Sequence, residues 1–402
     1  MSRTGPHPQP TGSPAPPAHR DRAHDRAPDH AHDRSGARSG AHAVPELPGV
    51  LTAADVLASA GYLLSAQRPD GAIPWFPGGH TDVWDHVECA MALTATGHTD
   101  AARRAYTWLG TVQLPDGSWP AKLRQNAPAS PLREANHAAY PAVGLWHHLL
   151  VTGDDAFAAA VWPTVRAGME FALGLRTERG EIRWARDASG RAGDHALLTA
   201  CASIQHGLRC GAALGERLGD PQPEWELAAA RLGHLVAEHE SVFADRSRYS
   251  MDWYYPIIGG AVRGEAARRR LAERWDTFVV PGLGIRCVSD QPWVTGAETC
   301  ELVLALAAVG DTDRAAALLA DMQHLRDADD GAYWTGYQFA EDVRWPVERS
   351  TWTSAAVILA TDALSGSTPG AQVFTAPPEE AAAPAAPAFS APATCGCTAL
   401  VR

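Results

Sequence analysis

Four short connections divide the middle of this 402-residue chain into pairs of helices. They read Gly97-His-Thr-Asp, Thr152-Gly-Asp-Asp, Leu218-Gly-Asp-Pro and Val309-Gly-Asp-Thr, and each separates two stretches whose apolar residues recur three and four positions apart. Glycine readily ends a helix in a left-handed conformation, and Asp or Thr caps the helix that follows. Because these connections alternate with longer loops, the pattern predicts antiparallel helical hairpins.

The apolar periodicity predicts twelve helices in all. The expected ranges are 52–66, 83–96, 99–112, 136–151, 155–174, 194–218, 223–240, 250–260, 264–273, 295–309, 311–323 and 351–364. The stretch at 295–309 is apolar nearly all round and should be buried, whereas 311–323 carries Asp, Arg and Gln on one face and should be an outer helix. Six hairpins of this kind predict an all-α (α/α)6 toroid, with an open superhelix as the alternative.

Composition divides the chain into three segments. Residues 1–47 are rich in Pro, His, Asp and Arg, and residues 366–402 are rich in Ala and Pro and include Cys395-Gly-Cys397. Neither offers enough apolar surface to offset the entropy of ordering, so both are expected to be disordered tails. The toroid is expected at residues 48–365.

Charge and hydropathy limit the partners. The formal net charge of −12 argues against nucleic-acid binding, which needs a basic surface. No apolar run reaches the length of a membrane span, and the N-terminus lacks the apolar stretch of a secretion signal, so a cytoplasmic protein without an integral membrane segment is expected. The seven cysteines are odd in number and irregularly spaced, which favours free thiols.

The expected functional site is the end of the ring where the inner helices begin. Carboxylates and aromatic residues recur there at matched positions, which predicts a concave pocket for a small-molecule substrate. The candidate catalytic residues are Asp85, Glu88, Asp252, Glu298 and Glu348. The candidate substrate-binding residues are Trp84, His86, His137, Asp194, His195, Trp253, Tyr254, Trp293, Arg344, Trp345 and Trp352.

Each of these residues also has a purely structural interpretation. Asp85 could cap its helix, and Glu298 could be neutralised by a residue such as Arg286 instead of facing the pocket. His137 and His195 could be hydrogen-bonded structural histidines.

No cofactor is required by the sequence, although Mg²⁺ or Zn²⁺ is not excluded. Glu298-Thr-Cys300 places an acid and a thiol two residues apart, which alone is a weak zinc signal. No Cys-x-x-Cys pair, phosphate-binding glycine loop or Gly-x-Ser-x-Gly elbow occurs, so no metal site is predicted.

The segment Gln113-Leu-Pro-Asp-Gly-Ser-Trp119 is similar to the Gln-x-x-x-Gly-x-Trp repeat of squalene and other terpene cyclases. The segments at Gln67 and Asp329 are partial copies of it. Residues 50–365 as a whole resemble actinobacterial proteins labelled prenyltransferase or squalene-cyclase-like. This resemblance implies an α/α-toroid that acts on an isoprenoid, with Asp85 or Glu298 as the acid.

In that interpretation the faces of Trp253, Tyr254 and Trp293 would stabilise carbocations. It is the leading hypothesis of the sequence analysis, because the full Gln motif is the most specific local match. A non-catalytic binding toroid is a further alternative, since a fold does not fix a function.

A second resemblance competes with the first. Thr152-Gly-Asp-Asp-Ala-Phe157, Gly331-Ala-Tyr-Trp334 and Trp345-Pro-Val-Glu348 are similar to segments of six-hairpin glycosidases such as glucoamylase-like enzymes. These enzymes place two carboxylates across a sugar, about 6.5–9.5 Å apart when they invert configuration. The resemblance implies Asp85 or Asp252 opposite Glu298 or Glu348, with Trp84, Trp293 and Trp345 stacked on sugar faces.

Overall fold

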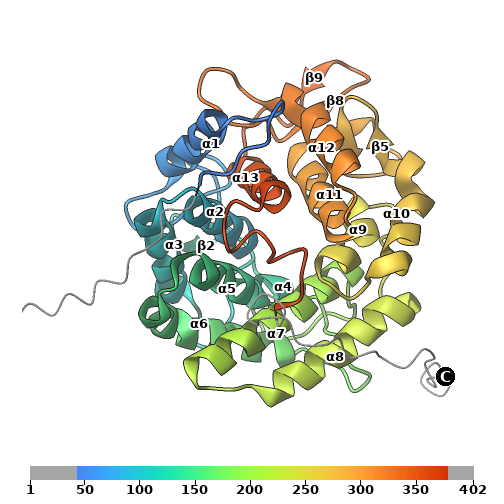
Figure 1. Ribbon diagram of the computed structural model, residues 1–402. Helices are drawn as coiled ribbons and strands as arrows, with labels where there is room; N and C mark the ends of the chain where they lie inside the picture. The colour runs from blue at the N-terminus through green and yellow to red at the C-terminus, as the bar shows by residue number, and fades with distance from the viewer. Residues whose placement is uncertain (1–42, 379–402) are drawn as a thin grey trace, which may run out of the picture. The chain divides into compact units, whose positions relative to one another are not determined.

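The computed structural model describes residues 43–378, and in this part of the chain the long helices form two rings (Figure 1). The inner ring consists of α2 (Val83–Ala95), α5 (Pro141–Thr152), α7 (Leu198–Leu218), α9 (Ser250–Ile258), α11 (Gly296–Ala308) and α13 (Thr351–Ser365). The outer ring consists of α1 (Ala53–Ala66), α3 (Thr99–Val112), α6 (Asp155–Leu173), α8 (Pro223–Glu238), α10 (Gly264–Phe278) and α12 (Thr312–Asp321). Every residue of α2 is buried, whereas α3 buries only one side.

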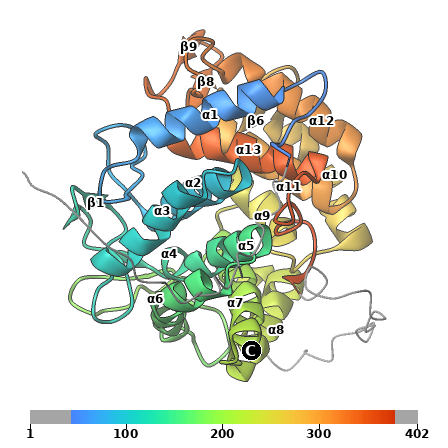
Figure 2. The same cartoon turned by 60° about the vertical axis from the view of Figure 1, so that its left-hand side comes forward.

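The inner ring is closed. Each inner helix packs against the next, in the order α2, α5, α7, α9, α11 and α13, and α13 packs against α2. The first outer helix, α1, pairs with the last inner helix, α13, so the two ends of the toroid complete the sixth hairpin (Figure 2). The predicted (α/α)6 toroid is therefore confirmed, and the open superhelix is not formed.

The short connections cap the helices as expected. Gly153 and Gly219 are left-handed, with φ of 65° and 75°, and end α5 and α7. The Asp154 side chain accepts a hydrogen bond from the Phe157 amide at the start of α6, and Asp311 accepts one from Arg314 at the start of α12. These caps satisfy amide groups that have no partner inside the helix.

The helix predicted at 136–151 is interrupted. The structure has α4 (Ala135–Ala139) followed by α5, and the break falls at Tyr140 and Pro141. Pro141 is the first residue of α5, the position where proline's missing amide and fixed φ are tolerated.

Short strands, which the periodicity did not predict, occupy several loops. Three small antiparallel arrangements are formed by β1 (Leu123–Arg124) with β2 (Ala127–Pro128), by β3 (Arg133–Glu134) with β4 (Ala185–Arg186), and by a five-stranded sheet of β5 (Val279–Val280), β6 (Gly284–Arg286), β7 (Trp293–Thr295), β8 (Gly336–Gln338) and β9 (Val343–Arg344). Two 3-10 turns, η1 (Glu240–Val242) and η2 (Met322–Leu325), follow α8 and α12.

The chain after α13 departs from the expected boundary at residue 365. Residues 366–378 return across the ring, and Val373 and Phe374 are buried in the core. The His206 ring bonds the Val373 carbonyl oxygen at 2.9 Å and contacts the Phe374 ring edge-on. Thr368 also donates two hydrogen bonds to Asp362, so polar and apolar contacts together hold a segment whose composition is otherwise typical of a tail. Residues 1–42, and Cys395-Gly-Cys397 with the rest of 379–402, lie outside the described residues.

Three features bear on the other sequence-based expectations for residues 43–378. The cysteines at 89, 201, 210, 287 and 300 are free thiols. No helix in this range has both the length and the apolarity needed to cross a membrane. No group of three or more His, Cys, Asp and Glu side chains in this range could hold a metal ion.

The Gln-x-x-Asp-Gly-x-Trp segment is a clamp between outer helices. Gln113 follows the last turn of α3, and its Nε2 donates to the Gly117 carbonyl oxygen in its own turn and to the Thr164 carbonyl oxygen in α6, both at 2.9 Å. Gly117 has a φ of 83°, and a Cβ there would lie 2.1 Å from the Ala167 carbonyl oxygen. The motif therefore fixes a tight turn against the next outer helix.

The partial copy at Gln67 performs the same task one hairpin earlier. Its Nε2 donates to the carbonyl oxygens of Gly71 and Ala101, at 3.1 and 2.9 Å, and a Cβ on Gly71 would lie 2.3 Å from the Arg104 carbonyl oxygen in α3. The motif thus belongs to the construction of the toroid and carries no information about its chemistry.

Replacing Gln113 by Ala is expected to lower the free energy of unfolding by about 1–3 kcal/mol, because two carbonyl oxygens lose their donor. Gln113→Glu should destabilise the protein similarly, since a carboxylate cannot donate. Both can be measured by denaturant unfolding. An unchanged free energy of unfolding would contradict the clamp, and activity per folded molecule should stay at the wild-type value.

Candidate active site

A cavity of about 650 Å³ lies at the end of the ring where the inner helices begin. Its walls come from the first turns of α2, α4, α7, α9 and α13 and from the loops before them. Five carboxylates line it, namely Asp82, Asp85, Glu134, Asp252 and Glu348. The predicted location of the site, at the inner-helix N-termini, is therefore a real concavity.

Two tryptophan–glutamate pairs stand on different walls. The Trp75 indole N–H donates to Glu348 Oε1 at 2.6 Å, and the Trp184 indole N–H donates to Glu134 Oε2 at 3.1 Å. Trp75 and Trp184 are half-buried and present part of their rings to the cavity. Each pair couples an aromatic surface to an acceptor with a second oxygen, which is the combination that binds a sugar ring and its hydroxyl groups.

Asp82 and Asp85 form a buried carboxyl pair at the start of α2. Asp82 caps the helix by accepting from the Asp85 amide at 2.9 Å. Burial and the neighbouring Asp82 charge raise the pKa of Asp85 well above its ordinary value. Burial acts to raise the pKa of Asp82, but the side-chain and backbone hydrogen bonds from Asp85, together with the neighbouring His137 and His80, lower it overall. The two shifts have opposite signs, so Asp85 binds a proton more readily than Asp82 does.

Asp252 lies on the opposite side of the ring, at the start of α9, which is three inner helices away from α2. Its Oδ1 accepts from the Thr199 amide at 3.2 Å and from the Thr199 hydroxyl at 2.6 Å. Burial raises the pKa of Asp252, and the Thr199 hydrogen bonds only partly offset it. Thr199 engages Oδ1, so Oδ2 is the oxygen that these two hydrogen bonds leave unoccupied.

Glu88 lies below the cavity, as a support for its floor. Its carboxylate accepts from the Trp84 and Trp352 indole N–H groups, at 3.1 and 2.7 Å, and from the Tyr140 hydroxyl at 2.7 Å. Trp84 and Trp352 line the cavity, and the Trp84 ring stacks on Tyr140 with ring centroids 4.3 Å apart. Burial raises the pKa of Glu88 to about 7. Its position makes it a group that orients the two tryptophans.

Of the residues predicted for the site, six line the cavity: Trp84, Asp85, His137, Asp252, Glu348 and Trp352. Helix rotation accounts for three of the others. His86 turns outward and bonds the Ile73 amide and the Ala105 carbonyl oxygen. Trp253 donates to the Arg270 carbonyl oxygen and stacks on Phe278, under α10. Tyr254 donates to Glu301, deeper in the ring.

The remaining predicted residues lie elsewhere for other reasons. Glu298 is buried beside the Cys287 thiol, below the cavity. Asp194 and His195 are exposed on the loop before α7, because the helix begins at Leu198 and not at 194. Trp293, Arg344 and Trp345 belong to the five-stranded sheet and its edge, where the Trp293 indole bonds the Trp345 carbonyl oxygen and Arg344 bonds that of His324.

The residues that the prediction missed come mainly from loops. Trp75, His80, Trp184, Arg246 and Tyr249 line the cavity from the connections that precede inner helices. Asp82, Glu134 and Asn136 also line the cavity, at the starts of α2 and α4; the sequence places them at inner-helix N-termini, although they are not among the candidate site residues. Trp75 and Trp184 had a detectable signal, since each follows a glycine-containing turn.

Comparison with known proteins gives one strong match. The chain is 55% identical over 332 residues to the MMP endo-(1,4)-3-O-methyl-alpha-D-mannosidase of Mycolicibacterium hassiacum, an alignment that covers 83% of this chain and 92% of the relative. No family model matches the chain.

Solved structures share the fold at low sequence identity. A wild-type glycosidase superposes with a TM-score of 0.63 at 16% identity, covering 78% of this chain and 97% of its own. A D-mannose isomerase superposes with a TM-score of 0.57 at 10% identity, covering 77% of this chain and 96% of its own.

The leading hypothesis of the sequence analysis, a prenyltransferase or terpene-cyclase-like transferase, is wrong. The relative at 55% identity is a mannosidase. The Gln motif that favoured a cyclase attaches a turn to an outer helix through the hydrogen bonds of Gln113, and Gln113 does not line the cavity. Of the three residues expected to stabilise carbocations, none lines the cavity. The competing resemblance, to six-hairpin glycosidases, is the one that the comparisons support.

The cavity at the inner-helix N-termini is lined by carboxylates and tryptophans, which is the kind of lining that suits an enzyme that cleaves glycosidic bonds. With 55% of residues identical across 92% of the mannosidase, this chain belongs to the family of that enzyme and is a glycoside hydrolase.

Proposed function

We propose that this protein is an endo-acting α-mannosidase that hydrolyses (1,4)-linked 3-O-methyl-α-D-mannosides. The observation that carries the proposal is the 55% identity over 332 residues to an enzyme with that activity. The cavity supports it with tryptophans in its lining and with carboxylates on several walls, of which those of Asp252 on α9 and Glu348 before α13 do not adjoin.

Asp252 is the proton donor and Glu348 the base in this proposal. Asp252 extends from α9 and Glu348 precedes α13. Because α11 lies between these two inner helices, the two carboxylates stand on different walls of the cavity. Asp252 gives its proton to the glycosidic oxygen as the bond from C1 to that oxygen breaks. Glu348 takes a proton from water while the water oxygen bonds to C1 from the opposite face, so the configuration inverts.

Asp85 and Asp82 then serve the sugar hydroxyl groups, since a protonated Asp85 donates a hydrogen bond and an ionised Asp82 accepts one. The wall beside Asp252 includes an apolar part, formed by Leu197, Ala200 and Met251, next to the polar Thr199 and Arg246. A methyl ether cannot donate a hydrogen bond, and these apolar side chains need no hydrogen bond from a ligand that packs against them. One buried methyl group contributes about 1–3 kcal/mol, or roughly 10–200-fold in kcat/KM.

The test is hydrolysis of matched α-(1,4)-mannotetraoses with and without 3-O-methyl groups, followed by NMR of the released anomer. The methylated substrate should be cleaved at internal bonds at least about tenfold faster, and the first product should be the β-anomer. Equal rates on both substrates would show that the apolar wall does not select for the methyl group. No cleavage of either substrate would refute the proposed function. Release of the α-anomer would show retention of configuration, and therefore a covalent intermediate in place of direct attack by water.

A further inference from the structure

Three hydrogen-bond donors converge on one buried carboxylate beneath the active-site cavity. Glu88 lies on the second turn of α2 and is 4% exposed. Its Oε1 accepts from the Trp84 indole N–H and the Tyr140 hydroxyl, and its Oε2 accepts from the Trp352 indole N–H. The donors belong to α2, to the junction of α4 and α5, and to α13. One side chain therefore joins three parts of the inner ring.

Two of these donors belong to the cavity wall. Trp84 and Trp352 both line the cavity. The Trp352 ring also lies beside Trp75, with ring centroids 5.8 Å apart, and the Trp75 indole bonds Glu348. The hydrogen bonds of Glu88 therefore fix the aromatic surface that adjoins the proposed base.

The three donors are complementary to the ionised form of Glu88. An indole N–H donates and cannot accept, and an ionised carboxylate has about four lone-pair sites for the three donors. A proton on Oε2 would face the Trp352 N–H, which is another donor. Of the three partners, only the Tyr140 hydroxyl can turn to accept a proton from Oε1, and Trp84 would then donate to a weaker acceptor. Protonation also converts charge-assisted hydrogen bonds into weaker neutral ones.

The surroundings of Glu88 oppose its ionisation. The titratable groups that interact with its charge are Asp82 at the N-cap of α2, Asp85 and Cys89 on α2, Tyr140, Tyr255 on α9, and Cys300 and Glu301 on α11. Each of these groups is neutral or anionic. Burial, helped by the Asp82 charge, outweighs the three hydrogen bonds and raises the pKa of Glu88 to about 7. The ionised form that suits the donors is therefore lost when the pH falls below neutrality.

We propose that Glu88 is a positioning residue that holds Trp84 and Trp352 in their substrate-binding orientation only while it is ionised, so that its protonation releases both rings and weakens saccharide binding. The saccharide as ligand rests on the proposed function, whereas the release of the rings does not. Acid then acts on the floor of the cavity, separately from the proton donor and the base.

The first test needs no ligand and follows the near-UV circular dichroism of the full chain from about pH 5 to about pH 9. A tryptophan transition centred near pH 7 is expected, and it should be absent in Glu88→Gln. The amide does not ionise, and its nitrogen is a donor that faces other donors. Tyr140→Phe keeps the ring and removes one hydrogen bond to the anion, so the transition should move to a higher pH. This second variant tests the inference even if Glu88→Gln does not fold.

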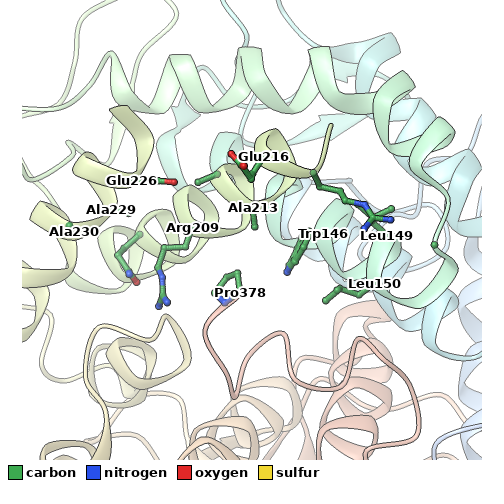
Figure 3. A pocket seen from close by; sticks show the side chains of 14 residues that line it. Trp146, Leu149, Leu150, Arg209, Ala213, Glu216, Glu226, Ala229, Ala230 and Pro378 are labelled. Carbon is green, nitrogen blue, oxygen red and sulfur yellow. The ribbon is translucent and has the colours of Figure 1, made fainter. Parts of the chain in front are cut away.

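Two matched controls should keep the transition. Glu301→Gln changes another buried carboxylate of the inner ring, whose amide oxygen can still accept from the Tyr254 hydroxyl. Glu216→Gln changes an exposed carboxylate on α7 at a separate cavity (Figure 3), which shares no lining residue with the active-site cavity.

Three outcomes of the dichroism overturn the inference. They are a wild-type chain without the transition, a transition that persists unchanged in Glu88→Gln, and a transition that Tyr140→Phe leaves at the same pH. Loss of the transition in His137→Gln alone would assign it to His137, whose ring contacts that of Trp84.

The second test is calorimetric titration of the full chain carrying Glu348→Gln with 3-O-methylated α-(1,4)-mannotetraose. Its affinity should fall roughly fivefold to tenfold as the pH is lowered through 7, and adding Glu88→Gln should give the lower affinity at every pH. If the dichroism transition is present and the tetraose binds at no pH, the positioning role stands and the proposed function fails. If the tetraose binds with the same affinity at every pH, the proposed function stands and the inference is overturned.

Discussion

Replacing Glu348 by Gln should lower kcat on the methylated mannoside by about 10³-fold, within the range lost when a general base is removed. The amide cannot take a proton from the attacking water. Its oxygen can still accept the Trp75 indole N–H, which now lies 2.6 Å from Oε1, so the wall should keep its shape. KM should therefore change little, and the loss should fall on kcat.

Azide provides the decisive measurement for this variant. An anion that needs no deprotonation can attack C1 without a base, so azide should restore turnover and give a β-mannosyl azide detectable by NMR. Glu341→Gln is the matched control, since Glu341 is exposed on the loop between β8 and β9 and lies outside the cavity lining. Full activity in Glu348→Gln, or a loss that azide does not relieve, would exclude Glu348 as the base.

The fold was predictable because its signals are local. Each cap lies within a few residues of the helix end it stabilises, as Asp154 does at α6, and the inner helices are recognisable from apolar residues on every side. The packing of 366–378 was not predictable, because Val373 and Phe374 are held by partners distant in sequence, such as His206, which is 167 residues from Val373. Local composition carries no information about such a long-range contact.

The position of the cavity was predictable, but its lining was not. Toroid geometry directs attention to the first turns of the inner helices, and the cavity lies there. Successive helix residues differ by about 100° in direction, so Asp252 can face the cavity only if Trp253 and Tyr254 face elsewhere. Choosing among them needs the rotation of α9 about its axis, which depends on Phe278 and Glu301.

The Gln motif shows why a specific local match can indicate the wrong chemistry. Its two hydrogen bonds and its glycine solve a problem of construction, the attachment of a turn to the next outer helix, which any toroid of this kind must solve. A solution to a structural problem recurs wherever the architecture recurs. Chemistry is better indicated by groups that the fold leaves incompletely bonded, such as the carboxylates of the cavity.

Replacing Asp252 by Asn should lower kcat on the natural substrate by about 10²–10³-fold, and by far less on aryl α-mannosides with acidic phenol leaving groups. A sugar alkoxide needs a proton to depart, whereas an acidic phenolate does not. The Thr199 amide and hydroxyl can still bond the Asn oxygen, so the helix start should be retained. Asp276→Asn, at an exposed position on α10, is the matched control.

The pH profile supplies an independent readout of the same role. A general acid works while protonated, so wild-type activity should fall as pH rises through the pKa of Asp252. Because burial raises that pKa, the fall should come at a higher pH than for an ordinary aspartate. In Asp252→Asn the alkaline fall should disappear along with most of the rate on the natural substrate. An equal loss of rate on natural and aryl substrates would show that Asp252 positions the substrate and is not the general acid. If Glu134→Gln gave the leaving-group dependence expected of Asp252→Asn, Glu134, beside Trp184, would be the general acid instead.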